Sequence, residues 1–207
     1  MKIILLGAPG SGKGTLAKKI TEDFGLIQIS TGDLFRECIK DESEFAQKVK
    51  SIMASGNLVP DEITVDLVKN RITQPDCQKG FILDGFPRNL TQAQALDKIT
   101  HIDGIILLEV KNQTVIERLS TRRTCLGCKE IYNTRTYKNT ECEKCGATLT
   151  QRDDDKPQAI KHRLEVYENT ITPLINFYSG RLFKVSADKS PEDTYKPVKT
   201  FLKNLEG

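Results

Sequence analysis

The nine residues GAPGSGKGT, at positions 7–15, follow directly on an apolar run at positions 3–6. This order is typical of a phosphate-binding loop: a buried strand ends, glycines let the backbone turn inward, and a helix begins with its N–H groups facing an anion. Lys13 then brings a cation to the β and γ phosphates. We interpret the segment as a nucleoside triphosphate site. The structural alternative is a glycine-rich turn before a surface helix with an exposed lysine.

The loop departs at one position from the general pattern G-x-x-x-x-G-K-[ST]. Gly7, Gly12 and Lys13 match this pattern, whereas Gly14 takes the hydroxyl position and Thr15 supplies the hydroxyl one residue later. Glycine adopts positive φ angles at little cost and leaves room for phosphate oxygens. Because strand, loop and helix still occur in the required order, we keep the phosphate-binding interpretation.

The chain has 207 residues, enough for one sizeable α/β core or for a core that carries small inserted domains. Its 31 basic and 28 acidic residues give a net charge of +3, and the two signs are interspersed along the chain. This balance is too slight to indicate nucleic-acid binding. The sequence contains no N-terminal secretion signal and no run of ~20 apolar residues. We therefore expect a soluble, cytoplasmic protein that binds neither nucleic acid nor membrane.

Apolar strand candidates alternate with helical patterns along the chain, as a parallel sheet built from right-handed crossovers requires. The predicted fold class is α/β, with a doubly wound five-stranded parallel sheet, helices on both faces and two small inserted domains. We expect strands at residues 3–6, 26–30, 81–84, 104–110 and 183–186. We expect helices at residues 14–24, 32–40, 42–54, 61–72, 90–98, 114–120, 158–179 and 191–205.

Two segments interrupt this alternation. Residues 30–59 have the pattern of helices with no strand between them, and residues 122–157 are polar, contain cysteines and show few helix signals. We place both at strand ends, the edge at which open α/β sheets bind ligands. Each segment is therefore predicted to be an insertion beside a ligand site.

A second motif, DGFPR at positions 84–88, ends another apolar strand. An acidic residue there can hold a magnesium ion, directly or through its waters, opposite the loop hydroxyl, so we assign Asp84 to magnesium, through water. Gly85 and Pro87 favour a turn that brings Arg88 close to the phosphates. The alternative is an ordinary turn with a solvated arginine.

Arginines near the two predicted insertions indicate the type of chemistry. Phosphoryl transfer between two nucleotides gathers many anionic oxygens, which guanidinium groups neutralise without a proton-transfer residue. Any single arginine could instead be a solvated surface charge. His101 and His162 lie in no catalytic pattern, and we expect solvated or structural roles for them. The arginines considered are Arg36, Arg88, Arg122, Arg123, Arg152 and Arg163.

Four cysteines form the pattern C-x2-C-x13-C-x2-C, in which two knuckles can present four thiolates to one zinc ion. Two disulfides are the alternative, which a reducing cytoplasm disfavours. Four protein ligands leave no open position for a substrate water, so we predict a structural Zn²⁺. Cys38 and Cys77 fit no pattern and are expected to be small core residues. The predicted zinc ligands are Cys125, Cys128, Cys142 and Cys145.

Together these motifs resemble the long-lid adenylate kinases, in the bacterial form with a zinc-binding lid, over essentially the whole chain. The resemblance implies a core of residues 1–29, 60–121 and 160–207, an AMP-binding insertion of residues 30–59, and a lid of residues 122–159 that closes over ATP. The family itself reads GKGT in the loop, and many relatives have aspartate where this chain has Cys145. The resemblance rests on residues 7–15, ISTGDLFR at 29–36, LDGFPRNLTQA at 83–93, Arg122, Arg123, the four cysteines, Arg152, Asp153, Asp154 and Arg163.

The resemblance also implies which residues meet each nucleotide. The implied ATP contacts are Gly10, Ser11, Gly12, Lys13, Gly14, Thr15, Arg122, Ile131, Tyr132 and the backbone of Lys189. The implied AMP contacts are Thr31, Arg36, Asn57, Leu58, Val59, Gly85, Phe86, Pro87, Arg88, Gln92, Arg152 and Arg163. The implied catalytic residues are Lys13, Arg88, Arg122, Arg152 and Arg163.

The implied reaction is a direct, in-line transfer of the γ-phosphoryl group of ATP to AMP, giving two ADP, with Mg²⁺ between the β and γ oxygens. Lid closure excludes water, which would otherwise accept the phosphoryl group. Transfer to UMP or CMP is one alternative, although Thr31 and Gln92 resemble the AMP choice. A zinc-ribbon ATPase that binds nucleic acid is another, but the ribbon's only aromatic residues are Tyr132 and Tyr137, and no basic run exceeds two residues. We expect a monomer, whose insertions swing freely.

Overall fold

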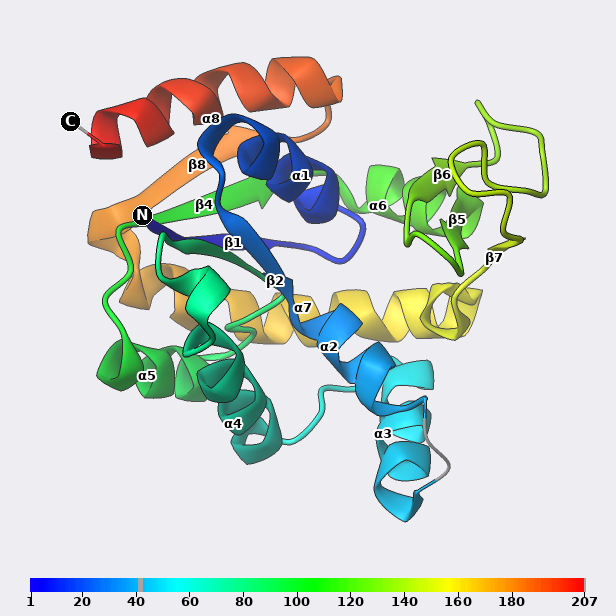
Figure 1. Cartoon of the computed structure of the whole chain (residues 1–207), viewed down its shortest axis with the longest axis horizontal. Coiled ribbons are helices and arrows are strands. Elements are labelled where there is room, and N and C mark those ends of the chain that lie inside the picture. Colours follow the sequence, from blue (N-terminus) through cyan, green and yellow to red (C-terminus); the bar gives the residue numbers. More distant parts are fainter. Residues whose placement is uncertain (41–42, 207) are drawn as a thin grey trace.

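In the computed structural model, which describes residues 1–40 and 43–206, a five-stranded parallel sheet forms the centre of the chain. Helices cover both of its faces, which confirms the predicted doubly wound α/β fold. Figure 1 shows α1 (Lys13–Phe24) and α8 (Pro191–Glu206) above the sheet, and α4 (Asp61–Ile72), α5 (Leu90–Ile99) and α7 (Pro157–Phe177) below it. In spatial order the strands are β2 (Ile27–Ser30), β3 (Phe81–Asp84), β1 (Lys2–Gly7), β4 (Gly104–Glu109) and β8 (Leu182–Ser186).

The central strand β1 is apolar on both sides because both sides are covered. Successive residues of a strand point to opposite faces, so Ile3 packs with the side chains of α1 and α8, whereas Ile4 packs with those of α4, α5 and α7. Both isoleucines are fully buried. Burial of one such side chain contributes roughly 1.5–3 kcal/mol, which makes this sheet the rigid frame for the loops at its carboxyl edge.

The first insertion consists of α2 (Thr31–Cys38) and α3 (Glu44–Ala54), with no strand between them in the described residues. The Ser30 hydroxyl caps α2 by accepting from Asp33 N at 3.3 Å, and the Ser43 hydroxyl caps α3 by accepting from Ala46 N at 3.1 Å. The predicted helix at 32–40 is shorter than expected, since α2 ends at Cys38. The predicted start of the next helix, Glu42, lies outside the described residues.

The second insertion is a small antiparallel sheet with the order β6-β5-β7. Its strands are β5 (Arg122–Cys125), β6 (Ile131–Asn133) and β7 (Leu149–Thr150). We predicted a polar segment with few helix signals here and did not predict these strands. They are too short to carry a recognisable alternation of polar and apolar residues.

Most other boundaries agree with prediction to within two residues. The bounds of β3 and α4 are as predicted, and α6 (Asn112–Thr121) begins two residues early. The predicted helix at 158–179 is α7, which starts one residue early, because Pro157 suits the first helical position, and ends at Phe177. Across the described residues, the helices are too short or too polar for a membrane span.

Candidate active site

The phosphate loop joins β1 to α1 at the carboxyl edge of the sheet. Gly7, Gly10 and Gly12 have φ angles of 145°, 78° and 101°, which side chains with a Cβ rarely adopt. Space also requires glycine, because a Cβ on Gly10 would lie 2.7 Å from Leu119 Cγ of α6. The first N–H groups of α1 have no acceptor within the helix, an arrangement that suits the anion predicted for this loop.

Lys13 begins α1 and turns its side chain back over the loop. Its Nζ donates to the carbonyl oxygens of Gly7 and Ala8, at 2.8 Å each. Burial lowers the pKa of Lys13 to about 8, while Asp84 opposes this shift and Arg88 adds to it. Anionic phosphate oxygens beside this ammonium would stabilise its charged form, so its placement suits the predicted contact with phosphate.

Asp84 ends β3 next to the phosphate loop. It pairs with Leu5 of β1 in the sheet register, and its Oδ2 lies 3.7 Å from the Cβ position of Gly14. Gln28 Nε2 donates to the same oxygen at 3.0 Å. Burial raises the pKa of Asp84, although Lys13 opposes this shift. A carboxylate oxygen is the donor type that Mg²⁺ prefers, so the residue fits the predicted magnesium contact.

Two arginines at the base of the lid are held by two carboxylates of η2 (Asp153–Asp155). Asp155 is fully buried and accepts from Arg122 Nε at 2.8 Å and from Arg122 Nη2 at 2.6 Å. Arg163 Nη1 on α7 lies 2.9 Å from Asp154 Oδ2 and 3.2 Å from Asp155 Oδ1. The two-nitrogen contact of Arg122 fixes the plane of its guanidinium, whereas Arg163 contacts both carboxylates through one nitrogen. The sequence analysis gave these carboxylates no role.

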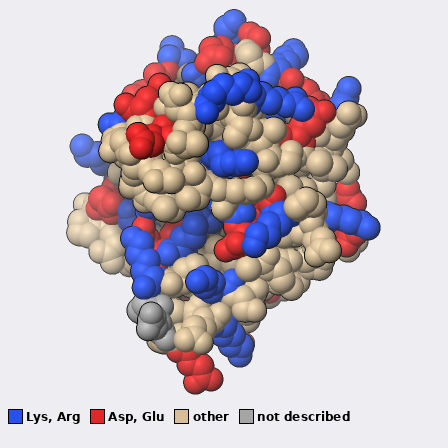
Figure 2. Space-filling model, turned by 90° about the vertical axis from the view of Figure 1, so that its right-hand side faces the viewer, with Lys and Arg blue, Asp and Glu red and all other residues tan. Residues whose placement is uncertain are grey.

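Three further arginines reach the same region from other segments: Arg36 on α2, Arg88 after β3, and Arg152 before η2. Burial lowers the pKa of Arg152 to about 10, and repulsion by Arg36 and Arg122 adds to this shift. Figure 2 shows basic side chains gathered in a recess on this side of the molecule, with acidic ones among them. The acceptors of the three guanidinium groups are Asp33 Oδ1 at 2.7 Å, Gly85 O at 2.8 Å and Thr124 Oγ1 at 3.0 Å, respectively.

Arg123, also considered from the sequence, has a different position. Its Nη1 donates to the carbonyl oxygens of Ser120 and Arg122, at 3.3 Å and 2.7 Å. The arginines that the structure brings together are therefore those of the predicted site, and Arg123 contributes to the turn that enters the lid.

The predicted AMP residues lie around the turn after β3. Thr31 Oγ1 donates to Gly85 O at 2.9 Å, and a Cβ on Gly85 would approach that hydroxyl to 3.1 Å. Gln92 is buried, and its Oε1 accepts from Arg88 N at 2.7 Å. Phe86 packs in the hydrophobic core, so only its backbone faces the turn. The predicted adenine segment, Asn57, Leu58 and Val59, connects α3 to α4.

The predicted contacts with the ATP base have different surroundings. Ile131 is 42% exposed, and its Cδ1 lies 3.9 Å from the Cβ position of Gly14. The Tyr132 hydroxyl instead lies 3.1 Å from Cys142 Sγ in the lid core, so this side chain faces away from the phosphate loop. Lys189 lies in the turn between β8 and α8. Its predicted ATP contact, through the backbone, stays a prediction.

Arg118 is a residue that the sequence analysis missed. Its Nη2 donates to Ala187 O at 2.7 Å, and its Nη1 donates to Ser11 O at 3.3 Å. It thereby ties the phosphate loop to the turn that contains Lys189. Its position in the last turn of α6, just before Arg122, was the one signal in the sequence that could have identified it.

The four lid cysteines come together as predicted. Their sulfur atoms all lie within 4.8 Å of one another, and none of the cysteines in the described residues is in a disulfide. Although burial opposes the shift, hydrogen bonds from Tyr132 and from backbone amides lower the pKa of Cys142 to about 6. Four converging sulfurs, of which Cys142 has a lowered pKa, fit a Zn²⁺ ion.

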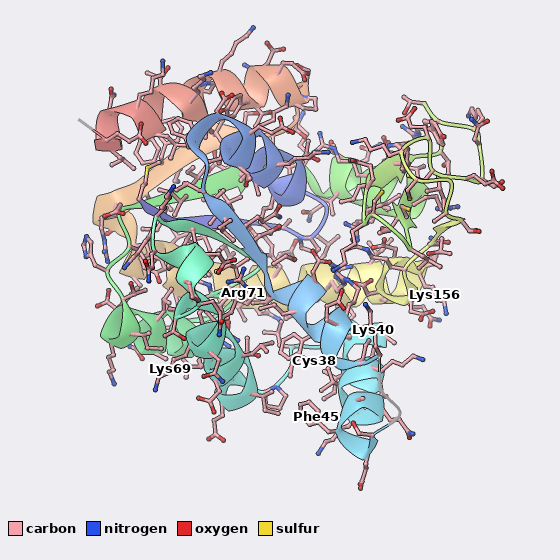
Figure 3. All side chains as sticks on the ribbon, in the orientation of Figure 1. Cys38, Lys40, Phe45, Lys69, Arg71 and Lys156 are labelled. Carbon is pink, nitrogen blue, oxygen red and sulfur yellow. The ribbon has the colours of Figure 1, made fainter. Side chains whose placement is uncertain are left out.

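The remaining two cysteines differ from each other. Cys77 is a buried core residue, as expected, and Arg71 Nη1 donates to its Sγ at 2.9 Å. Cys38 lies at the end of α2 and is only half-buried, so the expectation of a core position is wrong for it (Figure 3). The first insertion has a hydrophobic cluster of its own, and the last turn of α2 lies at its margin.

The two insertions touch each other across the site. Lys129 of the lid pairs with Glu37 of α2, and His162 Nε2 on α7 lies 2.7 Å from Asn57 Oδ1. A Cβ on Gly56 would meet Ala159 O at 3.0 Å, so the first insertion also packs closely on the start of α7. The phosphate loop and the arginines therefore lie between two insertions in contact.

Comparison with known proteins gives the family. The adenylate kinase family profile matches residues 5–182. The chain belongs to the adenylate kinase family. An adenylate kinase of Archaeoglobus fulgidus is 43% identical over 99% of both chains, and one of Fervidobacterium nodosum is 46% identical over 100% of this chain and 99% of its own. One of Lachnoclostridium phytofermentans is 50% identical over 87% of each chain. The family identifies the chain as a phosphotransferase of the nucleoside monophosphate kinase class.

Proposed function

We propose that this chain transfers the γ-phosphoryl group of ATP to AMP and releases two ADP. One observation supports the proposal most directly. Arginines from α2, from the β3–α5 turn and from both ends of the lid lie close to the phosphate loop. Two nucleotides bring many phosphate oxygens to one place, and these cations neutralise them.

In this proposal the two nucleotides enter from different sides. Residues 10–15 hold the ATP phosphates, while Ile131, the backbone of Tyr132 and the Lys189 turn lie beside the ATP base. AMP binds between the 57–59 segment and the turn after β3. Its proposed phosphate contacts are Arg36, Arg88, Arg152 and Arg163, and its remaining contacts are Thr31, Asn57, Leu58, Val59, Gly85, Phe86, Pro87 and Gln92.

An oxygen of the AMP phosphate attacks the γ phosphorus of ATP in line. The bond from that phosphorus to the β–γ bridging oxygen breaks, and ADP leaves with the electron pair. The attacking group is already an anion, so no side chain has to accept a proton. Lys13, Arg88, Arg122, Arg152 and Arg163 neutralise the charge that shifts during transfer. Mg²⁺, when bound with ATP, would be held by Asp84 through water and would shield the β and γ oxygens.

The lid and the AMP-binding insertion act as separate small domains in this proposal, at residues 122–159 and 30–59, on a core of residues 1–29, 60–121 and 160–207. Zn²⁺ bound by the four lid cysteines cross-links the two knuckles and has a structural role. Closure of the lid keeps water from the reacting phosphates. Both nucleotide sites come from one chain, which supports a monomer, and the free thiols agree with a cytoplasmic location.

A coupled assay for ADP formation tests this function. AMP, UMP, CMP and GMP are offered as acceptors with ATP and magnesium, and we expect activity to be largely confined to AMP. Preference for UMP or CMP would assign the chain to another monophosphate kinase activity. Hydrolysis of ATP that responds to nucleic acid and not to any monophosphate would overturn the proposal in favour of a nucleic-acid-dependent ATPase.

A further inference from the structure

We propose that Asp61 is a positioning residue that fixes the amide of Gln92 and thereby selects the base of the phosphoryl acceptor. Asp61 Oδ1, in the first turn of α4, accepts from Gln92 Nε2 at 2.7 Å. The other end of the same amide, Gln92 Oε1, accepts from Arg88 N at 2.7 Å. The inference rests on the proposed function, in which Gln92 is one of the AMP contacts that do not meet the phosphate, and it assigns Gln92 to the base.

These two contacts allow one orientation of the amide. A carboxylate accepts hydrogen bonds and donates none, so the NH₂ end of Gln92 has to face Asp61. A backbone N–H donates and does not accept, so the oxygen end has to face Arg88 N. An amide turned by 180° would place two donors together at Arg88 and two acceptors together at Asp61. The chemistry of the neighbours therefore determines the orientation.

A second contact fixes Asp61 itself. Asn89 Nδ2 donates to Asp61 Oδ1 at 2.9 Å and to Oδ2 at 3.2 Å. The same side chain caps α5, since Asn89 Oδ1 accepts from Gln92 N at 2.9 Å. The carboxylate is thus held between two amides. It connects the start of α4, which follows the end of the first insertion at residues 57–59, to the start of α5. Through Asp61, a shift of the 57–59 segment is therefore linked to the position of the Gln92 amide, which contacts the base in this proposal.

The locked amide has a definite hydrogen-bonding pattern. Each end uses one of its two positions on Asp61 or Arg88, which leaves one N–H on Nε2 and one lone pair on Oε1. The free N–H on Nε2 can donate to N1 of adenine, and the free lone pair on Oε1 can accept from the 6-amino group. A 6-oxopurine has the reverse pattern, with an acceptor at the 6-oxygen and a donor at N1–H. It would require the amide of Gln92 to be turned by 180°. Asp61 therefore favours a 6-aminopurine monophosphate over a 6-oxopurine one.

The test compares kcat/KM for AMP with kcat/KM for inosine monophosphate, whose base carries a 6-oxo group. For Asp61→Ala we expect the preference for AMP to fall about tenfold, mostly through a higher KM for AMP, with the KM for ATP unchanged. Asp61→Asn should lose less of the preference, because its Oδ1 can still accept from Gln92 while its amide also permits the turned state. Both variants are checked for folding by thermal unfolding.

Glu62→Ala is the matched control, since Glu62 is the other acidic residue in the first turn of α4. It removes the same charge from the helix start without breaking the contacts to Asn89 and Gln92, so it should lower the unfolding temperature less than Asp61→Ala does and leave the preference between the two acceptors unchanged. Equal losses with AMP and inosine monophosphate in both Asp61 variants would overturn the positioning role. If Gln92→Leu leaves the KM for AMP unchanged, the proposed AMP site itself is wrong, and this result is separate from the outcome for Asp61.

Discussion

The sheet and the lid of this molecule are stabilised in different ways. The sheet has fully buried aliphatic side chains on both faces, among them Ile4, Leu83 and Ile106. The lid has a cluster of three buried residues, of which Cys125 and Cys142 are predicted metal ligands and Tyr132 lies against one of them. Apolar burial can therefore account for the stability of the sheet. The lid has little apolar burial, and we expect its stability to depend on ionic contacts and on the proposed metal cross-link.

This difference matters for phosphoryl transfer. The phosphate loop has to be rigid, because catalysis depends on prepositioned charges, and it begins at a buried strand. In the proposed function the lid moves, because nucleotides enter and leave beneath it. A small domain with its own cross-link moves as one body without losing its fold. The two regions meet where Arg122 and Arg163 share the buried carboxylate of Asp155.

We expect the largest effect on activity when the phosphate loop loses the positive charge of Lys13. Lys13→Ala should lower kcat by on the order of 100-fold or more with the fold intact, because Lys13 stabilises charge that shifts between the β and γ phosphates. Steady-state kinetics and thermal unfolding measure the two quantities. Lys19→Ala is the control, since Lys19 lies on the same helix and pairs with Glu192 at 3.0 Å. Wild-type turnover in Lys13→Ala would contradict the assignment of the phosphate loop.

The second prediction distinguishes residues that bind AMP from residues that promote phosphoryl transfer. Arg36→Ala should raise the KM for AMP by about tenfold or more, since in the proposed site Arg36 of α2 contacts the AMP phosphate in the ground state. Arg163→Ala should mainly lower kcat, because Arg163 stabilises the transferring group. Separate titrations of ATP and AMP measure the split. A changed KM for ATP with an unchanged KM for AMP in Arg36→Ala would mean that the two nucleotide sites are assigned in reverse.

The same contrast explains which parts of the fold could be predicted. The bounds of β3 and α4 match the prediction because an apolar run before Asp84 and the pair Pro60–Asp61 are strong local signals. The lid strands were missed because they have only two to four residues, too few for a recognisable alternation of polar and apolar residues. Local patterns predict elements that carry their own apolar surface, and they failed for the short strands of the lid, where little apolar surface is buried.

Within the site, sequence patterns predicted the positively charged side chains better than the carboxylates that hold the site residues in place. Lys13 and Arg88 belong to motifs of fixed spacing, so their places at the strand ends could be predicted. The carboxylate that holds Arg122 is 33 residues away, and the one that holds Gln92 is 31 residues away. Such pairings depend on how the chain folds back, and no periodicity records them. Arg118 was missed for the same reason.

A smaller effect on activity is expected when the lid loses its cross-link. Cys142→Ser should remove the metal and lower the thermal midpoint by about 10 °C, because loss of a structural metal costs several kcal/mol. Substantial activity should remain at moderate temperature, since the arginines of the site do not touch the metal. Elemental analysis, thiol titration and thermal unfolding measure these outcomes.

Cys38→Ser is the control for this change, since Cys38 lies on α2 outside the cluster. Purified protein without near-stoichiometric metal, with all four lid thiols titrating freely, would contradict zinc binding. Complete loss of activity in a folded Cys142→Ser variant would show that the metal site positions the catalytic arginines directly.

The smallest effect concerns the contact between the two insertions. Lys129 and Glu37 can pair only when the lid and the AMP insertion lie together, so Lys129→Ala should favour opening. We expect kcat and the KM values to rise by about twofold, since the pair is exposed and the gain from such pairs is small. The difference from wild type should disappear at high salt, which screens exposed charges.

Lys40→Ala is the matched control, because Lys40, which Figure 3 labels, pairs with the same Glu37 from within the AMP insertion. It removes the same charge without releasing the lid, so its kcat should stay at the wild-type value. Equal changes in both variants would mean that the pair adjusts the charge of Glu37 and does not restrain opening.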